Sequence, residues 1–271
     1  MAQKRKPSTL AAKVVAVGSL IMLSGLSLTA AAFQPLITDD TGTQGTGGNQ
    51  LEFSQTRDRK RVSGETERTD TSAAVYTRGL GETLDVFIGL SHSRIDAPAP
   101  ASDVHGNANP TFGAKWRFFE NEASGTSIAV KPEIALPVSA GRESSGLGTG
   151  KTSGNLTFIL TQEVPFGAVH VNAGVGRDRF RNTDDNPNTT YRRASLAPVW
   201  DVSEEWKLAL DMGVEYAKAA GNTVRSRFVE LGAIYSPNKD LDLAVGVIRN
   251  SDDDNPRSTT HSVTAGATWR F

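Results

Sequence analysis

The sequence lacks cysteine altogether and contains only four histidines in 271 residues. Without a thiol, the chain cannot form a disulfide, a zinc–thiolate site or a cysteine nucleophile. The histidines are scattered, and no pair has the spacing expected of metal ligands. The residues therefore indicate neither a metal nor a cofactor. The four histidines are His92, His105, His170 and His261.

Long hydrophobic runs are missing beyond residue 32, and hydrophobic residues make up only 38% of the chain. No later stretch is long and apolar enough for a membrane-spanning helix. The chain also lacks a basic excess, with 29 basic and 30 acidic side chains, so nothing indicates nucleic-acid binding. This composition suits a soluble protein. It also suits a membrane β-barrel, which exposes only alternate residues to lipid.

The first 32 residues differ from the rest and have the pattern of a secretory signal peptide. Basic residues at 4–6 precede an apolar core at 14–26, and small residues at 28–32 give the Ala-x-Ala spacing of a cleavage site. An uncleaved anchor helix is the alternative, because the apolar run approaches the length that a bilayer requires. We expect a cleaved signal peptide over 1–32, followed by a Gly- and Thr-rich lead-in over 33–48.

Alternation of apolar and polar side chains dominates the remainder, and a period of two is the signature of a β-strand. The clearest examples are 206–216 and 83–91. In 206–216, Trp206, Leu208 and Leu210 share one face, while Lys207 and Asp211 occupy the other. Ten further candidates bring the total to about twelve strands. They lie near 49–57, 71–79, 111–119, 126–136, 155–163, 167–176, 191–202, 224–235, 241–249 and 259–271.

The connections between these candidates alternate between short and long. Outer-membrane barrels have this asymmetry, with short periplasmic turns and longer outer loops. The short connections are 79–82, 120–125, 164–166, 203–205 and 236–240. The long polar ones are 58–70, 92–110, 137–154, 177–190, 217–223 and 250–258.

Aromatic residues near the chain end fit the same interpretation. Trp206, Trp269 and Phe271 would lie in an aromatic girdle at the periplasmic interface, and a terminal aromatic is what the assembly machinery reads in many barrels. We therefore predict an all-β protein: a transmembrane antiparallel up-and-down β-barrel of about twelve strands over 49–271. Its place would be the outer membrane of a Gram-negative cell, in contact with lipid and lipopolysaccharide.

A soluble β-sandwich is the alternative fold. Its apolar faces would be buried in protein, and its opposite faces should be rich in charge because water covers them. The opposite faces here mix Gly, Ala, Ser and Thr with isolated charges, which suits a crowded barrel interior better.

Charged residues of both signs are expected on the inner face. As the lining of a pore they would set its selectivity, so neutralising Lys115 or Asp211 should alter it. As filler they would pair with one another in a narrow lumen. The sequence leaves both roles open. The candidates are Glu52, Asp85, Lys115, Arg117, Lys131, Glu133, Lys207, Asp211, Glu215, Glu230 and Asp242.

Two weaker signals point to other chemistry. His170 and Asn172 share the predicted inner face, as in a lipid-cleaving barrel, but no serine can be placed beside His170. The similar loops 181–187 and 249–256 cluster Asp and Asn, which are calcium ligands, yet Asp-Asn-Pro is also ordinary turn chemistry. We expect no catalytic site and no metal.

The lead-in resembles the opening of a known outer-membrane family, labelled "MetA-pathway of phenol degradation". Its members begin the mature chain with a Pro-Leu-x-Thr-Asp-Asp-x-Gly-Thr-like stretch that leads to a Glu on the first strand. Looser similarity continues at 79–85, 113–116, 134–137 and the Trp-Arg-Phe end. The residues that carry the motif here are Pro35, Thr38, Asp39, Asp40, Gly42 and Gly45.

This resemblance implies an outer-membrane channel for small organic, often aromatic or hydrophobic, compounds, without catalytic residues to carry over. The motif itself could form an inward-folded cap or a periplasmic segment. The function that the sequence predicts is therefore that of a passive channel. The alternatives are a closed structural or surface-interaction barrel that acts through its outer loops, and a hydrolase that needs an active serine or carboxylate.

Overall fold

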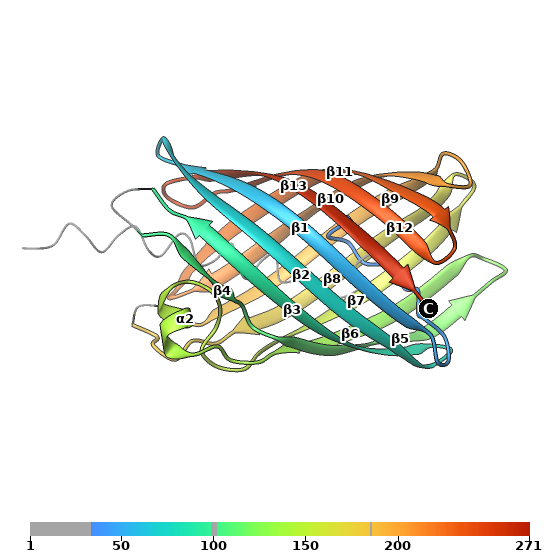
Figure 1. Ribbon diagram of the computed structural model, residues 1–271, viewed down its shortest axis with the longest axis horizontal. Helices are drawn as coiled ribbons and strands as arrows, with labels where there is room; N and C mark the ends of the chain where they lie inside the picture. The colour runs from blue at the N-terminus through green and yellow to red at the C-terminus, as the bar shows by residue number, and fades with distance from the viewer. Residues whose placement is uncertain (1–33, 99–101, 185) are drawn as a thin grey trace, which may run out of the picture.

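The computed structural model describes residues 34–98, 102–184 and 186–271, so the expected signal peptide and Phe33 lie outside the described residues. These residues form one short helix and a single β-sheet (Figure 1). Among them, no helix is long and apolar enough to cross a bilayer. The elements are β1 (Asn49–Val62), β2 (Glu65–Gly81), β3 (Leu84–Asp96), β4 (Val104–Asn107), β5 (Thr111–Asn121), β6 (Thr126–Ala135), α2 (Ala140–Ser144), β7 (Ser153–Val164), β8 (Gly167–Asp178), β9 (Thr189–Asp201), β10 (Trp206–Ala219), β11 (Asn222–Asn238), β12 (Leu241–Asp252) and β13 (Ser258–Arg270).

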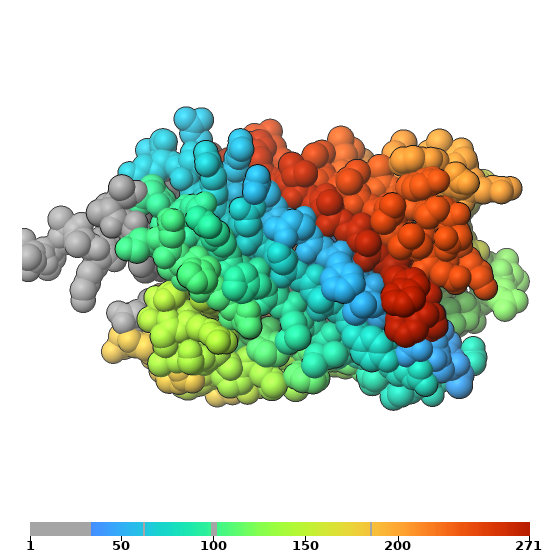
Figure 2. Space-filling view, in the orientation of Figure 1, coloured from blue at the N-terminus to red at the C-terminus, as the bar shows by residue number. Residues whose placement is uncertain are grey.

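The sheet closes on itself into a barrel. Neighbouring strands are antiparallel, and β1 pairs with β13 along its length, from Gln50 opposite Arg270 to Val62 opposite Ser258. The short β4 pairs with β3 beyond the end of β5, so it extends the β5 position rather than adding another to the wall. Figure 2 shows the end of β13, in dark red, against the start of β1 on the barrel surface. The predicted twelve-stranded up-and-down barrel is confirmed.

The barrel is inside out compared with a soluble protein. On β10, Leu208 and Met212 are exposed, whereas Asp211 has no exposed surface. On β1, Phe53 is exposed and Glu52 is buried. A closed barrel can present such an apolar surface to hydrocarbon because every backbone group is paired within the wall. The hydrophobic side chains therefore face lipid, and the chemistry of the molecule lies inside.

Connections at the two ends differ, but less regularly than the sequence indicated. The five predicted short turns are present. The strict alternation with long loops is wrong, because 58–70 and 217–223 are strand hairpins that turn at 63–64 and 220–221. The strands β2 and β11 have 17 residues each, whereas about 10 suffice to cross a bilayer. Beyond the membrane both faces meet water, so the apolar–polar alternation that identifies a strand disappears.

Exposed aromatic residues gather near the short-turn end. The rings of Trp269 and Phe271 stack with centroids 4.4 Å apart, and those of Trp206 and Tyr235 lie 4.8 Å apart. Trp206 begins β10 directly after a short turn, Tyr235 lies near the end of β11 before the next short turn, and Trp269 and Phe271 lie at the end of β13 and of the chain. Their contact with the membrane interface stays a prediction.

Candidate functional site in the barrel lumen

Residues 34–48, here called the plug, fold back from the start of β1 into the lumen (Figure 1). They enter at the short-turn end, where Gly47 and Gly48 pair with Gly79 of β2 through backbone hydrogen bonds. Further in, Thr38 and Asp39 are 0% and 1% exposed. Of the two positions that the motif allowed, inside the barrel or in the periplasm, the structure has the first.

Hydrogen bonds from the wall hold the plug backbone. The Asp211 carboxylate on β10 accepts from the amides of Ile37 and Thr38, at 2.9 and 2.7 Å, and from the Thr38 hydroxyl at 2.6 Å. Asn172 on β8 accepts from the Asp39 amide and donates to the Asp39 carbonyl, both at 2.8 Å. Two inward side chains thus satisfy a stretch of backbone that makes no ladder of its own, as buried backbone requires.

A buried ion-pair cluster fixes the plug on the other side. Asp39 lies between two lysines, with Lys131 Nζ at 2.7 Å and Lys115 Nζ at 3.4 Å from its carboxylate oxygens. Lys115 also lies 3.5 Å from Asp40. Glu52 of β1 faces the same cluster. Two lysines with almost no exposed surface need such counter-charges, because an unpaired buried charge is costly.

A third set of contacts attaches the plug to the β2–β3 turn and to β3. The Thr46 hydroxyl and amide donate to Glu82, and the Gln44 amide donates to both carboxylate oxygens of Asp85. Because Thr46 donates to its carboxylate, the pKa of Glu82 lies below its ordinary value. Glu82 and Asp85 belong to one of the looser family-like stretches, 79–85, and Lys115 belongs to another, 113–116. These separated stretches meet at the plug.

The other end of the plug rests on small residues of the wall. Leu36 packs with Ala197, Val199 and Ala209 in an apolar cluster. Pro35 lies over Gly246 of β12, where a Cβ would come within 3.2 Å of the proline Cβ. A side chain at this position would therefore press on Pro35 of the plug as well as on Glu230 and Thr264 of the wall.

The eleven predicted inner charges sort into three groups. Asp85, Lys115, Lys131 and Asp211 contact the plug directly, as described above. Glu52 and Glu230 are buried within the lumen, at 2% and 0% exposure. The rest are divided between the short-turn rim and the other half of the lumen. At the rim, Arg117 pairs with Glu120, Lys207 with Asp201 and Asp242 with Arg270, whereas Glu133 and Glu215 line cavities farther in.

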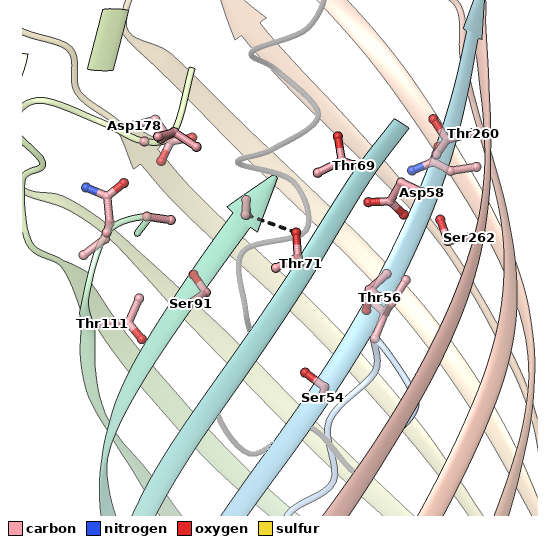
Figure 3. Close-up of a pocket in the computed structure, with 18 of the residues that line it drawn as sticks. Ser54, Thr56, Asp58, Thr69, Thr71, Ser91, Thr111, Asp178, Thr260 and Ser262 are labelled. Carbon is pink, nitrogen blue, oxygen red and sulfur yellow. Dashed lines mark hydrogen bonds between the residues drawn. The ribbon is translucent and has the colours of Figure 1, made fainter. Parts of the chain in front are cut away.

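A cavity of about 270 Å³ lies on the long-loop side of the plug. The plug residues Gln34 to Ile37 form part of its boundary. Hydroxyl side chains cover the wall that β1, β2, β3 and β13 contribute, as Figure 3 shows. We call this space the vestibule. Its hydroxyl residues are Ser54, Thr56, Thr69, Thr71, Ser91, Ser93, Thr111, Thr260, Ser262 and Thr264.

The β6–β7 connection, 136–152, narrows the vestibule at its outer end. Its Leu147 is 2% exposed and lines the cavity. Asn109 ties the connection down by donating to the carbonyls of Leu136 and Thr149 and accepting from the Thr149 amide. Glu143 of α2 accepts from the amide of Arg181 in the next outer connection. Hydrogen bonds therefore hold the β6–β7 connection in place on two sides.

Several vestibule residues escaped the sequence reasoning because they fall in stretches expected to be loops. Asp58, Lys60 and Glu67 lie in the predicted loop 58–70, and Asp178 lies in 177–190. A usable signal was present: Ser54, Thr56, Asp58 and Lys60 continue the inward parity of Glu52. The Ser63–Gly64 pair, with φ of 50° and 91°, is a tight hairpin turn.

The weaker sequence signals have ordinary surroundings in the structure. His170 is buried, and its Nδ1 lies 3.0 Å from the Thr161 hydroxyl. In loop 249–256, Asp253 pairs with Arg225, and Asp252 accepts from the amides of Asp254 and Ser258. No group of three or more His, Asp or Glu in the described part of the chain is arranged to hold a metal ion. Asp185 lies outside the described residues.

Comparisons with known proteins agree with the architecture. Residues 27–271 match the sequence profile of the family described as "Putative MetA-pathway of phenol degradation". The fold is similar to the COG4313 outer membrane channel from Pseudomonas putida F1, with a TM-score of 0.70 and 12% identity over 87% of this chain and 100% of that one. Comparison with curated proteins found no match.

Two autotransporter barrels are also similar. The translocator domain of NalP from Neisseria meningitidis has a TM-score of 0.56 and 14% identity over 94% of this chain and 97% of that one. The β-domain of the Bordetella autotransporter BrkA has a TM-score of 0.54 and 12% identity over 83% and 100%. At these identities the similarity shows the fold, which is that of outer-membrane barrels.

Proposed function

Because the chain belongs to the MetA-pathway family of outer-membrane barrels, over residues 27–271, we propose that it is a channel for small organic solutes. In this proposal the vestibule receives the solute and the plug is the gate below it. The short-turn end faces the periplasm, as it does in outer-membrane barrels generally.

The chemistry of the plug contacts carries this proposal. The plug is held mainly by hydrogen bonds and ion pairs to Asp211, Asn172, Lys115 and Lys131, and only Leu36 belongs to a buried apolar cluster. Water can replace each polar contact, so a typical one contributes only about 1 kcal/mol net. Apolar packing over the same length would resist exposure to water far more. Such a segment is suited to leave the lumen and return.

The vestibule is large enough for a single aromatic ring. A cavity of about 150 Å³ holds benzene in an engineered protein, and this one has about 270 Å³. Its wall is mostly hydroxyl side chains, with apolar surface from Pro35, Leu36 and Ile248. Small aromatic compounds, the class that the family description names through phenol, fit this space.

A closed barrel that acts through its outer loops is the second candidate. The observation in its favour is the buried pairing of Asp39 with two lysines, which fills the short-turn half of the lumen. If that pairing never breaks, the lumen is a packed interior. The hairpins beyond the membrane would then carry the function.

Deleting residues 34–46 separates the two candidates. This change keeps Gly47, Gly48 and the signal region, so β1 can still start at its place. For a gated channel, planar-bilayer recordings of the deleted barrel should show steady conductance at least about tenfold above wild type, because a lumen of twelve strands lies between filled and open barrels. Phenol uptake into liposomes should rise as well.

A variant with Gly and Ser at the same thirteen positions is the matched control. It keeps the volume but not the contacts, so it should conduct between wild type and the deletion. Heat-modifiable migration on gels checks that each barrel is folded. A folded deletion variant that conducts no better than wild type would overturn the channel and favour action through the loops.

A further inference from the structure

Three acceptor oxygens form a patch on the vestibule wall, on adjacent strands. Asp58 lies on β1, Thr260 on β13 and Asn250 on β12. Asn250 and Thr260 are direct cross-strand partners, and Asp58 is paired with Ser262, two residues from Thr260 on the same face. Side chains in such positions are within about 5 to 8 Å of one another. Figure 3 shows Asp58, Thr260 and Ser262 together on this wall.

None of these three oxygens has a hydrogen-bond partner among the described residues. They are Asp58 Oδ1, Thr260 Oγ1 and Asn250 Oδ1, all of them buried. Thr260 is 6% exposed. Buried polar atoms are almost always bonded, so three unsatisfied ones gathered on three adjacent strands of one cavity wall call for an explanation. In the plug half, Asp39, Asp85 and Asp211 accept hydrogen bonds. The unsatisfied carboxylate oxygens of that half, on Glu52 and Glu230, do not line the vestibule.

The charge around the patch favours a donor. Lys60 is the nearest cation to Asp58 on the inward face of β1, and its cross-strand partner on β2 is Glu67. That lysine therefore has a carboxylate directly opposite. Asp58 adds a carboxylate that can only accept when ionised. A ligand carboxylate placed here would meet like charge and unpaired lone pairs.

Apolar surface lies directly beside the acceptors. Ile248 is two residues before Asn250 on the same face of β12 and is the cross-strand partner of Ser262. Ile248, Pro35 and Leu36 all line the vestibule. A ligand with an apolar body and one polar head would bury its body against these residues while its head meets the patch.

We propose that Asp58, Thr260 and Asn250 form a subsite for a hydrogen-bond-donating head group, a hydroxyl or an ammonium, on a small apolar molecule. The vestibule thereby selects alcohols, phenols and protonated amines over carboxylates of the same shape. Entry of the molecule from outside rests on the proposed channel, but the subsite itself is a binding site that can be measured without transport.

The test uses three ligands of matched shape: benzylammonium, benzyl alcohol and benzoate. Dissociation constants are measured by ligand-observed NMR on the folded barrel in detergent, at neutral pH. Benzylammonium and benzyl alcohol should bind at least about tenfold more tightly than benzoate, the scale of one hydrogen bond to a charged group. The first two ligands separate the ammonium from the hydroxyl form of the donor.

Asp58→Asn should weaken benzylammonium about tenfold and bring benzoate close to the alcohol. Asp70→Asn is the matched control, because Asp70 lies on the neighbouring strand, faces outward and pairs with Arg57. If Asp58→Asn fails to fold, Thr260→Val serves instead, and it should weaken benzyl alcohol several-fold while sparing benzoate.

Equal binding of all three ligands, or the same profile in Asp58→Asn and Asp70→Asn, would overturn the subsite, as would the absence of saturable binding to the folded wild type. The proposal of a channel is tested separately from the proposal of the subsite. A barrel that never conducts yet binds donors through Asp58 defeats the channel alone, whereas a conducting barrel without this dependence defeats the subsite alone.

Discussion

The short-turn half of the lumen and the long-loop half are enclosed by the same wall but differ in what their polar side chains contact. In the first half, Asp211, Asn172 and Lys131 bond a segment of the chain itself. In the second, Asp58, Asn250 and Thr260 keep unsatisfied oxygens on the wall of the vestibule, whereas the unsatisfied oxygens of the first half, on Glu52 and Glu230, do not line it. Inward polar residues of a barrel therefore have two uses: some replace water for a folded segment, and others remain available to a solute.

The difference also changes what a mutation in the lumen should do. From the sequence, neutralising Lys115 or Asp211 was expected to alter the selectivity of a pore. Since both residues contact the plug, neutralising either should first loosen the plug. Selectivity is then the property of vestibule residues, whose loss would leave the plug in place.

Among the changes that test this difference between the two halves, Asp39→Ala should have the largest effect on how often the plug leaves the lumen. The change leaves Lys115 and Lys131 buried without their shared counter-charge, and breaking a buried pair in this way costs about 3–5 kcal/mol. The equilibrium population in which the plug has left the lumen should therefore rise by about two to nearly four orders of magnitude, at about 1.4 kcal/mol for each factor of ten. Because the chain has no cysteine, thiol labelling of Ile37→Cys in this background reports the plug alone.

Asp253→Ala provides the control for charge removal. Asp253 pairs with Arg225 at a site where both side chains are more than a third exposed, and such pairs contribute about 0–1 kcal/mol. Labelling of Ile37→Cys should stay near the wild-type rate in this background. Equal labelling rates with Asp39→Ala and Asp253→Ala would show that the buried pairing does not hold the plug.

A smaller effect is expected from Gly246→Ala, which tests the fit of the plug against the wall. The added Cβ would come within 3.2 Å of Pro35 and within 2.5 Å of a Glu230 oxygen. Overpacking of this kind costs about 1–3 kcal/mol, so labelling of Ile37→Cys should rise roughly tenfold. Gly81→Ala is the matched control, because a Cβ there meets nothing within 4 Å. An unchanged rate in Gly246→Ala would mean that the wall yields and the close approach is incidental.

Much of the wall could be predicted from the sequence, because one local rule governs it. Lipid on one side and a polar lumen on the other force apolar and polar residues to alternate, and Leu208, Ala209 and Asp211 show it plainly. Where the strands extend beyond the membrane, no lipid requires an apolar outer face, so the alternation is lost. Asp58 and Lys60 were consequently placed in a loop, although they continue the inward face of β1.

The contents of the lumen could not be predicted in the same way. The alternation of apolar and polar residues predicts that Lys115, Lys131 and Asp211 face inward. It does not predict which inward residues contact one another. Asp39 is 76 and 92 positions away from its two lysines, and no local pattern spans such a distance. The family-like motif identified the segment that matters. The position of this segment inside the barrel depends on the closed wall, because the buried charges of the wall need partners and the segment supplies them.

The smallest expected effect concerns the outermost attachment of the plug, at Glu82. Thr46 donates to this carboxylate through its hydroxyl at 2.6 Å and its amide at 3.3 Å, and these bonds lower the pKa of Glu82. A lowered pKa in the folded state means that the stabilisation is present above the ordinary value of about 4.3 and is lost as the pH falls through the lowered pKa. Amide-exchange protection of residues 43–47 should therefore fall below about pH 4 in the wild type. In Glu82→Gln, which has no charge to lose, protection should already be weaker at pH 7, by about two- to threefold, and should change little on acidification. If both proteins lose protection in parallel, the acid sensitivity belongs to Asp85 or to the buried carboxylates deeper in the lumen, and the attachment at Glu82 contributes nothing to holding the plug.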